Sequence, residues 1–140
     1  MFNEIINDNS FKNMMKSHSK EIVEFILQSN TEFKIVVNLS SIHFKPELPK
    51  DIQKNFLKLP VIMFELANYT LESAKATKKA LEFEAGFGED DFASTLTIPY
   101  DGIVQILVKD KPIFINLSIY SSEDKKREKS KKIFSSFDGE

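Results

Sequence analysis

The sequence predicts an α+β domain that is mainly β, with one N-terminal helix on a small β-sandwich or partly open barrel of about six short strands. Three observations predict this class. An early segment repeats apolar residues at helical spacing, later segments alternate apolar with polar residues, and Pro or Gly separates most of them. The chain of 140 residues has the length of one domain and contains no Cys, so we expect a core that needs no disulfide.

The first predicted element is an amphipathic helix over residues 10–30, with Ser10 as its N-cap. Its apolar stripe is wide, because Val23 and Leu27 extend it beyond what one neighbouring sheet covers. A second copy of the chain is the expected partner of the outer side, and the alternative is a helix buried within a monomer. The predicted dimer interface consists of Ile22, Val23, Phe25, Ile26 and Leu27.

Alternation predicts the first strand over residues 33–39, whose apolar residues Phe33, Ile35, Val37 and Leu39 share one face. Residues 42–44 either extend this strand or turn a corner. After a loop with two prolines, residues 50–57 have the length of two helical turns.

The following strands are less uniform. Residues 61–66 are nearly all apolar, which predicts a strand that is covered on both faces or meets a ligand with its outer face. Residues 68–76 predict a weaker strand, and 105–108 another. The last strand is expected over 113–120, with an inward set of Ile113, Ile115, Leu117 and Ile119.

The centre of the predicted fold is a hairpin over residues 81–99. Its first strand has an apolar face made of Leu81, Phe83, Ala85 and Phe87. Gly86 and Gly88 lead into the acidic residues 89–91, where the chain can turn. In the second strand Leu96 and Ile98 alternate with threonines, and Pro99 ends the pairing.

This hairpin resembles the SspB family, the bacterial adaptors that hand peptide-tagged proteins to the ClpX unfoldase of the ClpXP protease. The likeness rests on FEAGFGE followed by LTIPYDGIV, in which Phe87 and Gly88, then Ile98 and Pro99, occupy the family's positions. PELPKDIQKNFLKLPVIMFEL resembles the shorter-type members. The resemblance covers about residues 22–120. The chain departs from the pattern in two places: Glu89 replaces the second glycine, and the next connection is longer and more acidic.

The resemblance implies an Sm-like, peptide-binding domain over residues 1–120 that acts as a homodimer in the bacterial cytoplasm, without catalysis. It also implies a groove for an ssrA-type degradation tag beside the central strands. The groove residues that it suggests are Phe44, Pro46, Leu48, Ile62, Phe64, Phe83, Phe87 and Gly88. Strand alternation places some of these in the core instead.

Residues 121–140 are basic and poor in apolar residues, so we expect a flexible tail. Its charge comes from Lys125, Lys126, Arg127, Lys129, Lys131 and Lys132. An apolar patch of Ile133, Phe134 and Phe137 lies near its end. Composition alone fits a solvated tail with incidental apolar residues. The resemblance implies instead a tether whose apolar end docks on ClpX.

The sequence contains no motif for catalysis, a metal or a cofactor. His18 and His43 lack ligand spacing, and with no Cys we interpret both as structural. The acidic turn lacks the EF-hand pattern, and neither a G-x-S-x-G motif nor a Gly-rich phosphate loop occurs.

The net charge of −2 argues against bulk binding of nucleic acid, and no segment has the apolar length of a membrane span. Residues 1–10 also lack the features of a signal peptide. Two alternatives to the adaptor remain. One is a small RNA-binding barrel whose salt-dependent affinity centres on the basic tail. The other is a small-molecule-binding domain with its pocket under Phe64 and Phe83.

Overall fold

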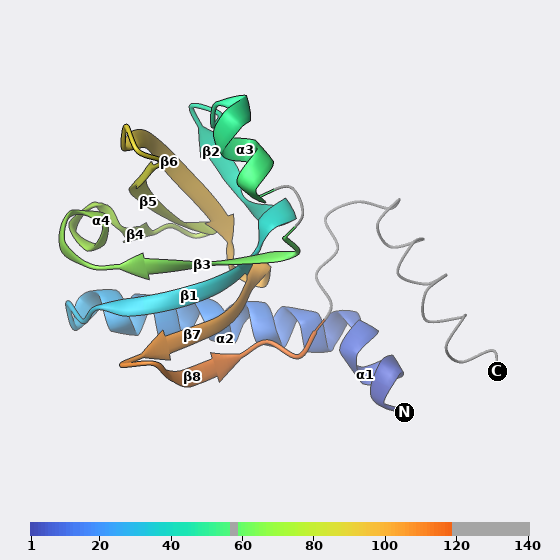
Figure 1. Cartoon of the computed structure of the whole chain (residues 1–140). Coiled ribbons are helices and arrows are strands. Elements are labelled where there is room, and N and C mark those ends of the chain that lie inside the picture. Colours follow the sequence, from blue (N-terminus) through green and yellow to red (C-terminus); the bar gives the residue numbers. More distant parts are fainter. Residues whose placement is uncertain (57–58, 119–140) are drawn as a thin grey trace.

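The computed structural model describes residues 1–56 and 59–118 (Figure 1). Two four-stranded antiparallel sheets pack face to face, and the N-terminal helices pack against them. The predicted α+β class with an N-terminal helix is confirmed, although the described ranges contain eight strands rather than about six. The sheets do not close into a single barrel, because they share no paired strand.

Two helices open the chain, α1 (Phe2–Asn7) and α2 (Asn9–Gln28). The Asp8 side chain accepts a 3.0 Å hydrogen bond from the backbone N–H of Phe11, so Asp8 is the N-cap of α2. The prediction of Ser10 as the N-cap was wrong, because Ser10 already lies within the helix. No periodicity predicted α1, which buries only Ile6.

The first sheet has the strand order β3-β1-β7-β8, with β1 and β7 at its centre. Its strands are β1 (Phe33–Asn38), β3 (Val61–Leu66), β7 (Ile103–Val108) and β8 (Lys111–Ile115). Ile35 of β1 lies opposite Phe64 of β3 and Ile106 of β7, and all three are buried. The predicted strand is therefore confirmed over residues 33–38 as a central strand with one face in the core, while Leu39, which was predicted to share that face, lies just beyond its end.

The second sheet has the order β2-β6-β5-β4. Its strands are β2 (His43–Lys45), β4 (Lys75–Ala76), β5 (Ala80–Phe87) and β6 (Phe92–Pro99). The 3₁₀ turn η1 (Leu39–Ser41) carries the chain from one sheet to the other, so residues 42–44 do not extend the first strand: they follow the corner, and His43 and Phe44 belong to β2. The central hairpin is confirmed: Phe87 pairs with Phe92, and Gly88 has a φ of 75° at the start of the turn.

Two predictions between residues 50 and 76 need correction. Helix α3 (Lys50–Phe56) forms as expected. Of the two alternatives for residues 61–66, cover on both faces is wrong, since Met63 lies exposed on the outer face of the edge strand β3, and the alternative of an outer face that meets a ligand stays a prediction. Residues 68–76 form α4 (Asn68–Ser73) before the two-residue β4, and not one strand. In α4, Leu71 packs on the core while the Ser73 hydroxyl accepts a 2.9 Å hydrogen bond from the Glu84 N–H of β5.

The predicted inward set of the last strand was also wrong. Phe114 of β8 pairs with the buried Ile106 and points into the core, so its neighbours Ile113 and Ile115 are exposed, as is Leu117. Alternation gives the period of a strand but not the face that the core will cover. Ile119 lies outside the described residues.

The core lies between the two sheets and extends to α2. Its largest fully buried side chains are Tyr100, Phe83, Ile35, Leu66, Leu81, Leu96, Ile98, Ile103 and Ile106. Tyr100 opens the 3₁₀ turn η2 (Tyr100–Gly102), which joins β6 to β7 and packs against α2.

Candidate functional site

Four phenylalanines link the two sheets near one end of the molecule. Phe44 meets Phe87 with ring centroids 5.9 Å apart, Phe87 meets Phe64 at 6.3 Å, and Phe64 meets Phe83 at 5.6 Å. All three pairs pack edge to face, the favoured geometry for aromatic rings. Since Phe64, Phe83 and Phe87 are buried and Phe44 only partly so, the cluster runs from the core to the surface at β2.

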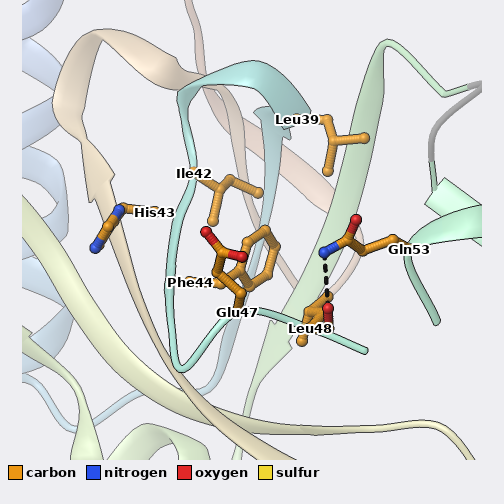
Figure 2. A pocket seen from close by; sticks show the side chains of 7 residues that line it. All are labelled: Leu39, Ile42, His43, Phe44, Glu47, Leu48 and Gln53. Carbon is orange, nitrogen blue, oxygen red and sulfur yellow. Dashed lines mark hydrogen bonds between the residues drawn. The ribbon is translucent and has the colours of Figure 1, made fainter. Parts of the chain in front are cut away.

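A pocket of about 390 Å³ opens at the Phe44 end of this cluster (Figure 2). It is lined by Leu39, Ile42, His43, Phe44, Glu47, Leu48 and Gln53. Leu39, Ile42, Phe44 and Leu48 give it apolar walls, while the carboxylate of Glu47 and the amide of Gln53 are its polar groups. A pocket with this lining suits an apolar side chain that carries polar atoms beside it.

Hydrogen bonds fix the loop that forms one wall of the pocket. The Gln53 side-chain amide of α3 donates to the Leu48 carbonyl at 2.7 Å (Figure 2), and the buried Ser94 hydroxyl of β6 donates to the Pro46 carbonyl at 2.8 Å. Gly88 lies close to α3, because a Cβ there would lie 3.2 Å from Ile52 Cδ1. Hydrogen bonds therefore hold the loop to α3 on one side and to β6 on the other.

Strand β2 is the edge of the second sheet, where it pairs only with β6. The backbone N–H and C=O groups on its other side therefore have no strand partner among the described elements. An exposed edge of this kind can pair with an extended chain. Because His43 and Phe44 belong both to β2 and to the pocket wall, the edge and the pocket form one continuous site.

The structure sorts the eight groove candidates by position. Phe44 and Leu48 line the pocket. Phe64, Phe83 and Phe87 are buried behind it, so they support the site without lining it. The remaining candidates are Pro46 and Gly88, both exposed, and the partly buried Ile62.

Sequence reasoning missed five lining residues, which are Leu39, Ile42, His43, Glu47 and Gln53. One feature of the sequence could have found them: all five lie in the continuous segment from the end of the first strand to the two-turn helix, which contains the two prolines of the loop. Leu39 opens the 3₁₀ turn η1 and Ile42 follows it, and both residues line the pocket.

The predicted dimer residues divide into two groups. Val23 and Ile26 lie in the monomer core, and Ile22 and Leu27 pack partly against it. Phe25 is 68% exposed and remains available to a partner. The tail at 121–140, with the predicted docking residues Ile133, Phe134 and Phe137, lies outside the described residues.

The described residues offer little reactive chemistry. No group of three or more His, Asp or Glu side chains in 1–56 and 59–118 is placed to hold a metal ion. Within the same ranges, no helix has the length and apolar character needed to cross a membrane. No protein-family model matches the chain, and no curated protein matches it.

Proposed function

We propose that the chain is a peptide-binding adaptor of the SspB type, with an Sm-like domain that holds an ssrA-type degradation tag for delivery to ClpX in the bacterial cytoplasm. The observation that carries the proposal is the apolar pocket beside the free edge of β2. The pocket occupies the segment in which the resemblance suggests a groove, and Phe44 and Leu48 belong to both.

The tag binds as an extended strand along β2 in this proposal. Its main chain gains hydrogen bonds from the unpaired side of His43–Lys45, and one of its apolar side chains enters the pocket against Phe44 and Leu48. Phe87 holds the Phe44 ring from behind. A wall that is ordered before the peptide arrives reduces the entropic cost of binding.

Delivery follows from linkage, without a chemical step. The domain holds the tag, the tail at 121–140 binds the unfoldase through Ile133, Phe134 and Phe137, and the two weak contacts together raise the local concentration of cargo. As a homodimer, the adaptor binds two tags and presents two tails to the unfoldase at once.

Fluorescence polarisation with a labelled ssrA-type peptide tests the binding site. We expect micromolar or tighter binding, and a roughly tenfold loss in Phe44→Ala because the pocket loses its aromatic wall. Phe2→Ala removes the same side chain from an exposed position on α1 and should bind as the parent does.

Thermal melting must show that each variant is folded, and Ile42→Ala gives a second reading from another apolar residue of the pocket lining. If the parent chain binds no tag peptide, the adaptor function is rejected. If it binds but both pocket variants retain full affinity, the site lies elsewhere.

Deleting residues 121–140 tests the tether. We expect tag binding to persist while ClpXP degradation of a tagged substrate loses its dependence on the adaptor. Unchanged delivery by the truncated chain would contradict the role of the tail.

A further inference from the structure

The outer faces of the two sheets differ sharply in composition. The second sheet presents polar side chains outward, namely His43, Lys45, Glu82, Glu84, Thr95 and Thr97, as the register of β2, β5 and β6 places them in rows. An antiparallel sheet with one face in water normally has this pattern. The second sheet therefore needs no cover on its outer face.

The outer face of the first sheet carries more apolar side chains, which share it with Lys34, Asn38, Glu65 and Gln105. The register places Met63, Val36, Gln105 and Ile115 in one row across β3, β1, β7 and β8. Val61 and Leu107 lie on the same face in the adjacent rows. We call Val36, Val61, Met63, Leu107 and Ile115 the outer apolar surface.

Neither α1 nor α2 covers this surface. Met63 is 54% exposed and Ile115 49% exposed. Helix α2 packs on the opposite side of the sheet, where His18 meets the inward-facing Phe114 with ring centroids 5.3 Å apart. In Figure 1, α2 accordingly passes behind β1 and β7. An exposed apolar sheet face of this kind marks a surface that another segment covers.

The chain supplies a segment suited to that role. Strand β8 forms one edge of the outer apolar surface, and after residues 116–120 the sequence continues into the polar, basic residues 121–132 and then the apolar group Ile133, Phe134 and Phe137. A chain of about 14 residues, the length of 119–132, reaches roughly 20 Å even when it is not fully extended. Three strand spacings, the distance from β8 to β3, come to about 14 Å. The apolar end can therefore reach every strand of the surface.

We propose that Ile133, Phe134 and Phe137 bind the outer apolar surface of their own chain. The tether favours this occupant, since a linked segment acts at an effective concentration of the order of millimolar, which a free second copy reaches only at high protein concentration. The composition agrees, because the tail has no other apolar cluster and the second sheet offers no apolar outer face.

Paramagnetic relaxation in the full chain tests the contact. The chain has no Cys, so Ser136→Cys carries a single nitroxide label between Phe134 and Phe137. We expect the amide signals of Val36, Met63 and Ile115 to broaden at low protein concentration, while those of Glu84 and Thr95 on the second sheet do not.

Adding Met63→Glu to the labelled chain should weaken the contact about tenfold, because a charge replaces a side chain that the tail buries. Met14→Glu is the matched control, since Met14 is 61% exposed on α2. It should leave the broadening unchanged. Equal effects of the two substitutions would overturn the proposal.

A mixture of two chains tells whether the tail comes from the same chain or from a second copy. One chain carries the nitroxide without ¹⁵N, and the other is ¹⁵N-enriched without the nitroxide. Broadening that appears in this mixture, at the strength seen in the labelled chain itself, would assign the surface to a second copy and overturn the intramolecular contact. Absent or evenly spread broadening in the labelled chain would overturn it as well.

A regulatory consequence rests on the proposed function. The same three tail residues are the proposed contact with ClpX, so binding to the sheet would withhold them until the unfoldase competes. The label experiment requires neither ClpX nor a tag peptide. The contact can therefore fail while the adaptor function stands, and the adaptor function can fail while the contact stands.

Discussion

At the scale of single residues, Tyr100 ties the turn before β5 to the core. Its buried hydroxyl donates, as a shared hydrogen bond, to the carbonyl oxygens of Thr77 at 2.5 Å and Ala80 at 3.0 Å. Burial raises the pKa of Tyr100 to about 12, helped by the charges of Glu24 and Glu82. A raised pKa means that the folded state holds this proton more tightly than the unfolded state does. The stability that it contributes is complete below pH 10 and falls as the pH rises toward 12.

Tyr100→Phe should therefore lower the free energy of unfolding by about 1 kcal/mol at pH 7, since two carbonyls lose their donor. The difference from the parent should shrink above pH 10, where only the parent has to keep a phenol protonated. Urea unfolding at pH 7 and pH 10.5 measures both effects. Tyr69→Phe is the control, because Tyr69 bonds Glu84 at an exposed position and should change stability less. A gap that widens with pH would contradict the argument.

Ser19 is the second informative residue. Its hydroxyl is fully buried in α2 and has no hydrogen-bond partner among the residues that the structure describes. Ser19→Ala removes this unsatisfied group and improves helix propensity, so we expect about 1 kcal/mol of added stability. Ser17→Ala changes an exposed serine of the same helix and gains only the propensity. Equal gains from the two substitutions in thermal unfolding would show that the buried hydroxyl carries no cost.

At the scale of elements, the start of α2 depends on one carboxylate. Asp8 caps the Phe11 N–H and places its negative charge at the helix N-terminus. Asp8→Ala should cost about 1 kcal/mol of stability, and Ser10→Ala, within the helix, should cost close to none. Chemical denaturation of the two variants decides between these caps. A larger loss at Ser10 would restore the assignment that the sequence favoured.

At the scale of the whole molecule, Phe25 is the exposed member of the predicted dimer interface, while Val23 and Ile26 serve the monomer core. We expect the parent to sediment as a dimer and Phe25→Glu as a monomer, because the interface would have to bury a carboxylate. Met63→Glu, on the outer apolar surface, should remain dimeric. A parent that sediments as a monomer, or a dimeric Phe25→Glu, would contradict the helix-mediated dimer.

The sequence by itself determined the elements whose signals are local. Strand alternation located β1 and the β5–β6 hairpin, helical spacing located α2, and the prolines bracketed α3. The resemblance pointed to Phe44 and Leu48, which line the pocket. These predictions succeeded because backbone geometry over a few residues is enough to produce each pattern.

Only the tertiary structure decided which face of each element is buried. Ile113 and Ile115 alternate as an inward set would, yet pairing with β7 turns Phe114 to the core. The same limit applies to the site: Phe83 and Phe87 lie on one face of β5 but behind the pocket, while His43, Glu47 and Gln53 line it. A strand has two chemically similar sides until its partners are placed, and partners distant in the sequence decide which side meets water.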